Sequence, residues 1–261
     1  MRGDLVAPVE LLPPGSGSLA RGVPDAVPGT LFVLGGRGGI RVEPRPRFPV
    51  VFGRNEPEVH VCVGDGDPRV SRRHGVLCYD RDRWTLRNTG SLPIRLPGSA
   101  LLLAGHEEPL GAVYTPLFIR TGPDREHLVE VRVAGRPVVG NSAEPEDATT
   151  APPVWQLTDD ERLALVSMGQ RYLRHEAHPR PETWAGVAAE LAELRPAAGW
   201  TAKKAEWCVV GVRKRLAAAG VRSLTREEVG EPVGNALNHN LVTELLVSTT
   251  IVPPDLRLLE G

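Results

Sequence analysis

Residues 48–75 read FPVVFGRNEPEVHVCVGDGDPRVSRRHG and contain the most informative pattern in this chain. Two short apolar runs, 48–52 and 59–63, have the length and residue types of β-strands. An arginine follows the first run, and a hydroxyl with more basic groups follows the second. The residues concerned are Gly53 and Arg54, then Ser71, Arg72, Arg73 and His74. An arginine fork beside a hydroxyl suits a tetrahedral anion such as phosphate, so the pattern indicates recognition of a phosphorylated partner.

The surrounding region, residues 28–134, has the pattern of an all-β domain. Short apolar runs recur, and turns rich in Gly, Asp, Asn and Pro separate them every 8 to 12 residues or so, which is the spacing of a β-sandwich. The glycine-rich stretch 35–39 lacks the Lys-Ser/Thr that follows in a phosphate-binding loop, and we interpret it as a turn between strands. Residues 1–27 are predicted to be an irregular N-terminal segment.

The character of the sequence changes after residue 134. Residues 135–154 are polar and contain prolines, which predicts a flexible linker. Residues 155–261 then show helical spacing. The fold class is therefore a multi-domain chain, with an all-β sandwich followed by a mainly α-helical domain.

Capping residues and apolar stripes place the helices of the second domain. Thr158 and Glu161 have the spacing of a capping box, and Thr201 is a suitable N-cap for a later helix. Gly220 is a plausible stop for that helix, and a further helix is expected over 236–247. Apolar side chains at helical spacing predict the core, with three tryptophans as its anchors. These positions are Leu163, Val166, Leu173, Val187, Leu191, Ala205, Val209, Val212 and Leu216, with Trp184, Trp200 and Trp207.

The bulk composition excludes several classes of protein. A net charge of −1 means that attraction to nucleic acid or membrane must come from a local patch. The three cysteines, Cys62, Cys78 and Cys208, form no C-x-x-C pair and lie in apolar stretches, so we expect buried, reduced thiols. No apolar run approaches the roughly 18 residues of a membrane span. We expect a cytoplasmic protein that needs no cofactor and no metal.

The strand region resembles the forkhead-associated (FHA) domain, a β-sandwich that binds phosphothreonine. The resemblance rests on Gly53-Arg54, Ser71 to His74, Trp84 and the stretch 88–91, in this order and at this spacing. It implies that Arg54 contacts the phosphate, that Ser71 hydrogen-bonds it, and that Arg72 and the neighbouring Arg73 add basic contacts. It also implies that Gly53 and His74 support the loops.

One position departs from the family pattern. FHA domains usually have Asn-Gly after the tryptophan-bearing strand, and the asparagine grips the peptide backbone; this chain has Pro93-Ile94 there. Proline has neither a side-chain amide nor a backbone N–H, so it cannot make that contact. Asn88 is nearby, at a position where the family tends to have an acidic residue. The sequence thus predicts a phosphate site without the usual hold on the peptide.

Residues 157–222 resemble a helix-turn-helix of the winged-helix type. The expected second helix of the pair carries a local excess of positive charge, and the candidate nucleic-acid contacts are Lys203, Lys204, Arg213 and Lys214. A protein-interacting helical bundle is the competing interpretation. Basic residues in a last helical turn also complement the helix dipole, so their presence alone does not require DNA. The DNA-binding and the protein-binding interpretation therefore both remain open.

We therefore expect a non-enzymatic adaptor that binds a threonine-phosphorylated protein downstream of a Ser/Thr kinase and engages a second partner through its helical domain. Two alternatives remain: a phosphorylation-responsive DNA-binding regulator, and a structural or oligomerisation module that no longer binds phosphopeptide. Ser71 and His74 lack an orienting acid, which argues against a hydrolase. A composition rich in Ala, Arg, Gly and Pro suggests an actinobacterial type of source.

Overall fold

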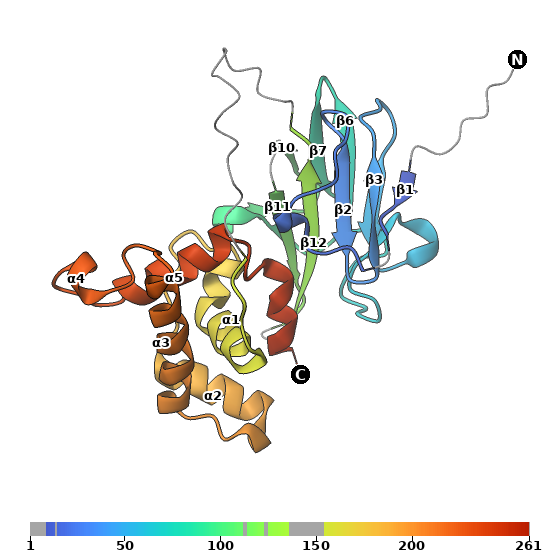
Figure 1. Cartoon of the computed structure of the whole chain (residues 1–261). Coiled ribbons are helices and arrows are strands. Elements are labelled where there is room, and N and C mark those ends of the chain that lie inside the picture. The colour runs from blue at the N-terminus through green and yellow to red at the C-terminus, as the bar shows by residue number, and fades with distance from the viewer. Residues whose placement is uncertain (1–8, 14, 112–113, 123–124, 136–153, 261) are drawn as a thin grey trace, which may run out of the picture. The chain divides into compact units, whose positions relative to one another are not determined.

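The computed structural model describes residues 9–13, 15–111, 114–122, 125–135 and 154–260. The chain divides into two compact units, residues 1–144 and 145–261, which are described separately below (Figure 1). All but the two end residues of the predicted linker at 135–154 lie outside the described residues. No described helix is both long and apolar enough to cross a bilayer.

The first unit is a sandwich of two β-sheets, which confirms the predicted fold class. The strands pair antiparallel except for β4 and β5, which are parallel. One sheet has the order β1 (Val9–Leu11), β3 (Gly38–Val42), β2 (Leu31–Gly35), β12 (Glu126–Val133), β11 (Tyr114–Arg120), β8 (Ile94–Arg95) and β9 (Leu101–Leu102). The other has the order β10 (Glu107–Leu110), β7 (Arg83–Asn88), β6 (Gly75–Asp80), β4 (Val50–Gly53) and β5 (Val61–Cys62).

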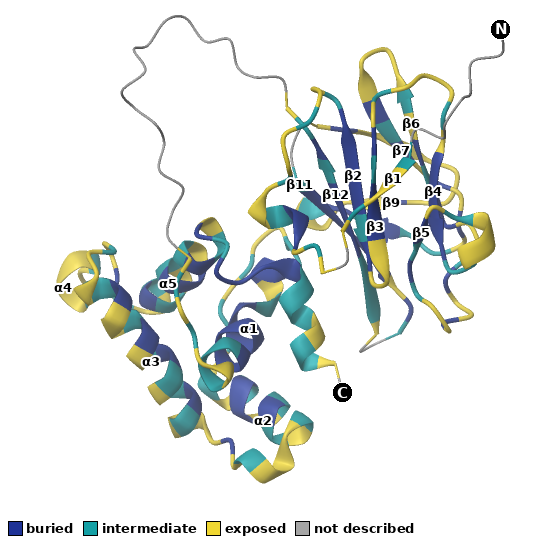
Figure 2. Ribbon diagram, turned by 45° about the vertical axis from the view of Figure 1, so that its right-hand side comes forward, coloured by how far each residue is buried: buried dark blue, intermediate teal, exposed yellow. Residues whose placement is uncertain are grey.

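Apolar side chains from both sheets form one core. Alternating positions of β6 and β7 point inward, so that Leu77, Trp84 and Leu86 are buried while their neighbours face outward. In Figure 2 the strands β2 and β4 are mostly dark blue, since nearly all of their residues are buried. The Trp84 indole N–H donates a hydrogen bond of 2.7 Å to the Gly29 carbonyl, which satisfies the polar atom of this buried ring. The same alternation places Cys78 on the outer face, where it is exposed. Cys62 and Cys208 are half-buried, so the expectation of three buried thiols was wrong.

Two edge strands were not foreseen from the sequence. Strand β10 contains Glu107, Glu108 and Pro109 and lacks an apolar alternation; proline is tolerated there because an edge strand leaves backbone groups unpaired. In the N-terminal segment, which was predicted to be irregular, β1 pairs with β3. Leu19 of the same segment is buried, in a 3-10 turn (Leu19–Arg21) that packs on β12.

The second unit is helical, as predicted. Its helices are α1 (Asp159–Leu173), α2 (Trp184–Leu194), α3 (Ala202–Ala218), the short α4 (Arg226–Val229) and α5 (Ala236–Val247), followed by a 3-10 segment (Pro253–Leu259). The capping box of Thr158 and Glu161 forms, and Thr201 caps α3. All nine apolar core positions expected from helical spacing are buried.

Two expectations for this unit were wrong. Trp200 is buried as expected, but Trp207 is 69% exposed. Trp207 belongs to the stripe of α3 formed by residues 203, 207, 211 and 214, which are all exposed to solvent. Residues 219–260 are all described and contain no strand, so the wing of a winged helix does not follow α3. A second capping box, formed by Thr225 and Glu228, instead starts the helix α4 there.

We predict that Thr158→Ala lowers the unfolding free energy of the helical unit by about 1 kcal/mol, because the first turn of α1 loses its cap. Urea denaturation followed by circular dichroism measures this change. Thr225→Ala is the matched control, since it uncaps only the four-residue helix α4 and should cost less. Equal losses for the two variants would contradict the assigned role of the α1 cap.

Candidate functional site

Three loops meet at the end of the five-stranded sheet: the loop after β4, the loop from β5 to β6, and the loop after β7. Their backbones are joined directly, because Arg54 N donates to Ser71 O at 3.2 Å and Asn55 N donates to Arg72 O at 3.3 Å. Thr89 N donates to His74 O at 2.9 Å and attaches the third loop. The sequence-predicted site residues of this unit therefore lie together.

Gly53 permits the close approach of the first two loops. A Cβ atom on this residue would lie 2.3 Å from the carbonyl oxygen of Arg72, which is far inside contact distance. The atoms that this Cβ would meet all belong to the backbone of Arg72 and His74, so a side chain here would force the Ser71 loop to shift. Glycine is therefore required at this position by packing.

His74 is fully buried and ties the loops together through both ring nitrogens. Its Nδ1 accepts a hydrogen bond from Ser71 N–H at 3.2 Å, so Nε2 carries the proton and donates to the Leu92 carbonyl at 3.1 Å. Burial lowers the pKa of this imidazole and favours the neutral form that this pattern requires. Neither nitrogen is left to act as a base toward the Ser71 hydroxyl.

The Ser71 hydroxyl is held by the third loop. Its oxygen accepts a hydrogen bond of 3.1 Å from Ser91 N–H, and the two serine hydroxyl oxygens lie 3.5 Å apart. While the oxygen accepts from Ser91 N–H, the Ser71 hydroxyl can still donate its proton, either to Ser91 Oγ or to an anion. The structure thus adds Ser91 to the residues that position this hydroxyl.

The arginines beside this hydroxyl have no partner side chain. The Nε of Arg54 is buried and has no hydrogen-bond partner among the described residues. Arg72 and Arg73 are exposed, and neither forms an ion pair within the described part of the chain. A buried donor without an acceptor is costly unless a ligand or water satisfies it, so the orphaned Arg54 nitrogen indicates an anion-binding position.

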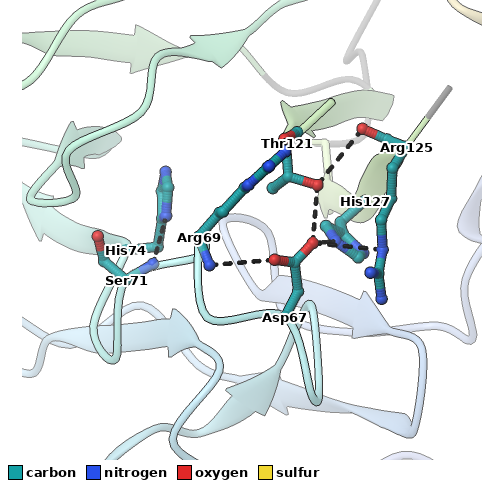
Figure 3. A network of polar contacts seen from close by, with 7 residues as sticks. All are labelled: Asp67, Arg69, Ser71, His74, Thr121, Arg125 and His127. Carbon is teal, nitrogen blue, oxygen red and sulfur yellow. Dashed lines mark hydrogen bonds and ion pairs between the residues drawn. The ribbon is translucent and has the colours of Figure 1, made fainter. Parts of the chain in front are cut away.

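Asp67 fixes the start of the loop that carries Ser71 (Figure 3). The carboxylate accepts hydrogen bonds from Thr121 Oγ1 at 2.7 Å, His127 Nε2 at 2.9 Å and Arg69 N at 3.0 Å, and it pairs with Arg125 at 3.3 Å. Burial opposes its ionisation, yet these donors hold its pKa far below the ordinary range. The network attaches the β5–β6 loop to the hairpin of β11 and β12.

This network also affects the charge balance of the site. Asp65, Asp67 and Arg69 all belong to the β5–β6 loop that carries Ser71. Asp67 is engaged by the network above, Asp65 pairs with Arg37, and the Arg69 guanidinium donates to the Thr121 carbonyl. Neither acid therefore compensates the positive charge at Arg54, Arg72 and Arg73.

Asn88 does not replace the missing asparagine. Its side chain is buried and its amide nitrogen donates to the carbonyls of Leu92 and Leu102, both at 2.9 Å. Its amide oxygen accepts from Gly90 N–H at 2.9 Å. Asn88 thus shapes the loop before Pro93 and has no group left for a peptide.

The basic residues of α3 are mostly engaged within the helical unit. Lys203 pairs with Glu206 at 2.9 Å, and Arg213 donates to the amide oxygen of Asn238 at 3.2 Å. Lys204 pairs with Asp160 at 2.9 Å and lies 4.3 Å from the centre of the Trp200 ring. Of the four predicted nucleic-acid contacts only Lys214 is exposed without an ion pair among the described residues, which weakens the case for DNA.

One family model matches the segment that carries the site. The family model of the FHA domain matches residues 50–93, a segment that begins with β4 and contains all three loops of the site. The predicted FHA resemblance is confirmed for this segment. No curated protein matches the chain.

Solved FHA domains are similar to part of this chain at low identity. The FHA-1 domain of Mycobacterium tuberculosis Rv1747 is 22% identical and covers 42% of this chain and 100% of its own, with a TM-score of 0.33. The N-terminal FHA domain of Saccharomyces cerevisiae Rad53p, solved with a phosphothreonine peptide, is 15% identical over 40% of this chain and 93% of its own, with a TM-score of 0.33. The FHA domain of human APLF, solved with an XRCC1 bisphospho peptide, is 21% identical over 40% and 98%, with a TM-score of 0.29.

We predict that Gly53→Ala destabilises the first unit by about 1–3 kcal/mol, because the new methyl group must displace the Arg72 carbonyl. Urea denaturation followed by intrinsic fluorescence reports the change. Gly17→Ala is the control, since a Cβ there meets nothing within 4 Å and φ is not positive. A Gly53→Ala protein as stable as the control would show that the loops are not closely packed.

The lowered pKa of His74 predicts a pH dependence of stability. An unfolded histidine takes up a proton near pH 6.5, whereas the buried ring stays neutral to lower pH, so the free energy of unfolding should fall as pH drops below about 6.5. Burial and Arg73 also lower the pKa of His60, which contributes in the same direction. Urea denaturation at pH 7.5 and 5.5 measures the effect. His60→Gln should retain part of it, and a His60→Gln protein with no pH dependence would contradict the role of His74.

Proposed function

We propose that this chain is a phosphothreonine-dependent adaptor in Ser/Thr kinase signalling, with the loops around Arg54 and Ser71 as its phosphate-binding site. The observation that carries the proposal is the buried Arg54 Nε, which has no acceptor in the described structure and lies in the loop paired with that of Ser71. Binding of an anion would satisfy this donor.

The charge and donors of the site fit a phosphate monoester. A phosphothreonine carries about −1.5 to −2 charges and three strong acceptor oxygens. Arg54 and Arg72 supply positive charge, and the Ser71 hydroxyl supplies a donor whose oxygen is already fixed by Ser91. Fixed donors lose little conformational freedom on binding, which favours affinity.

The helical unit is the proposed docking element for a second protein. Trp207 is 69% exposed on α3, and an exposed indole is typical of protein interfaces. The engaged state of Lys203, Lys204 and Arg213 favours a protein over DNA as that partner. The competing view, that the sandwich is only a structural module, rests on Pro93 and gives no account of the orphaned Arg54 donor.

We predict that the full chain binds a phosphothreonine peptide and that Arg54→Ala weakens this binding by about 2–5 kcal/mol, because a half-buried charge partner of the phosphate is removed. Fluorescence polarisation with a phosphothreonine peptide library and its unphosphorylated counterpart measures the affinities.

Arg83→Ala is the matched control for this experiment. Arg83 is exposed and unpaired among the described residues, and it lies opposite Asp80 at the far end of β6 from the site. It should bind phosphopeptide like the wild type. A wild-type protein that binds phosphorylated and unphosphorylated libraries equally would overturn the proposed function.

A further inference from the structure

The Asp67 carboxylate joins two parts of the first unit that are distant in sequence. Its Oδ2 atom accepts hydrogen bonds from Thr121 Oγ1 at 2.7 Å and from His127 Nε2 at 2.9 Å, which lie 54 and 60 residues away in the hairpin of β11 and β12. Arg125 of the same hairpin pairs with this oxygen at 3.3 Å. Asp67 itself is 2% exposed and belongs to the β5–β6 loop. The carboxylate therefore links the hairpin to the loop that carries the Ser71 hydroxyl.

The other carboxylate oxygen of Asp67 shapes the chain that leads to Ser71. Oδ1 accepts a hydrogen bond of 3.0 Å from Arg69 N–H (Figure 3), and the Asp67 carbonyl accepts one of 3.1 Å from Val70 N–H. These two bonds close a tight turn whose last residue directly precedes Ser71. The Val70 side chain is buried in the core of the sandwich, which fixes the end of the turn. The position of the Ser71 backbone thus follows from that of Asp67.

Arg69 adds a second link between this loop and the hairpin. Its guanidinium donates a hydrogen bond to the Thr121 carbonyl, while its own N–H is held by Asp67. The end of the hairpin is itself closed, because Thr121 N and Gly122 N both donate to the Arg125 carbonyl, at 2.9 Å and 3.2 Å. The loop is therefore attached to a segment that has its own hydrogen-bonded structure.

The Ser71 hydroxyl depends on such support because its side chain is short. An O–H···O hydrogen bond requires an oxygen separation of about 2.5–3.0 Å and weakens steeply when it is bent. A serine has a single torsion with which to correct the position of its oxygen, so a displaced backbone loses the contact. The longer Arg54 side chain can follow a phosphate after the same displacement. A shift of the loop should therefore weaken the Ser71 contact first.

We propose that Asp67 is a positioning residue for phosphate binding: together with Thr121 and His127, it holds the Ser71 hydroxyl where it can donate to a phosphate oxygen. The β11–β12 hairpin thereby sets the affinity of the site through this buried carboxylate. This inference rests on the proposed function.

Fluorescence polarisation with the full chain and the tightest-binding phosphothreonine peptide of the library tests the proposal. Ser71→Ala should weaken binding about tenfold to hundredfold, the value of one hydrogen bond to a charged group. Asp67→Asn keeps the size of the side chain but replaces an acceptor by an amide that faces donors of the hairpin. It should weaken binding at least about threefold, and by no more than Ser71→Ala does.

The double variant Asp67→Asn/Ser71→Ala gives the decisive measurement. If Asp67 acts through Ser71, its replacement adds nothing once the hydroxyl is gone, so the double variant should bind like Ser71→Ala. A loss equal to the product of the two single losses would overturn the proposal. In Asp67→Asn the NMR signal of the Arg54 Nε–H group should still shift when the peptide saturates the protein, because the contact made by Arg54 remains.

Thr121→Val tests the link from the hairpin side. It removes one donor to Asp67 without changing the loop, and it should weaken binding about twofold to threefold, again with no further loss in the Ser71→Ala background. This milder variant provides the test if Asp67→Asn does not fold.

Glu126→Gln is the matched control for a loss of stability. It breaks the pair that Glu126 forms with Arg95 at 2.9 Å, in which both side chains are 17% exposed. Glu126 precedes His127 on β12, and neighbouring residues of a strand point to opposite faces, so its carboxylate lies on the other side of the sheet from Asp67. Urea denaturation should show a lower stability, while the affinity for the peptide stays unchanged. Equal losses of affinity in Glu126→Gln and Asp67→Asn would contradict a specific role of Asp67.

The inference and the proposed function fail in distinguishable ways. If binding depends on Arg54 and Ser71 but not on Asp67 or Thr121, the positioning role is wrong and the proposed function stands. If the wild type binds the phosphorylated and unphosphorylated forms of the peptide equally, both are wrong.

Discussion

The buried imidazole of His74 is the constraint on which the site depends. Both of its nitrogens are used to hold backbone, at Ser71 N–H and at the Leu92 carbonyl, and its own backbone bonds to β4 and to Thr89. This single neutral ring therefore fixes two loops relative to the sheet. Asp67 fixes the other end of the Ser71 loop through a charged network. The loop segment between His74 and Asp67 carries the Ser71 hydroxyl, Arg72 and Arg73, and His74 and Asp67 hold it in place from both ends.

Much of the fold could be predicted because burial follows local periodicity. The alternation in the strands and the helical stripes with Thr158 and Thr201 as caps depend on nearby residues, and the structure follows them. Edge strand β10 could not be predicted, since it pairs on one side only and has no apolar pattern. Trp207 was placed in the core because an indole is usually buried, yet which helical stripe faces solvent is decided by packing.

The residues of the site could be predicted from the sequence, but their hydrogen-bond and ion-pair partners could not. Arg54, Ser71 and His74 follow from motif order, and the structure brings them together. The engagement of Asp67 by Thr121 and His127 joins positions more than fifty residues apart, so no local pattern reveals it. The same holds for the use of Asn88 within its own loop. Which charges remain free is a tertiary property, and it could therefore be learned only from the structure.

The central claim is that the Arg54 guanidinium binds the phosphate of a phosphothreonine. NMR of the arginine Nε–H groups tests this claim directly. On titration of the full chain with a phosphothreonine peptide, the Nε–H signal of Arg54, assigned by its loss in Arg54→Lys, should shift downfield and saturate, because this donor gains a charged acceptor. The Arg83 signal should stay in place. An Arg54 signal that does not move while the peptide binds would contradict the account.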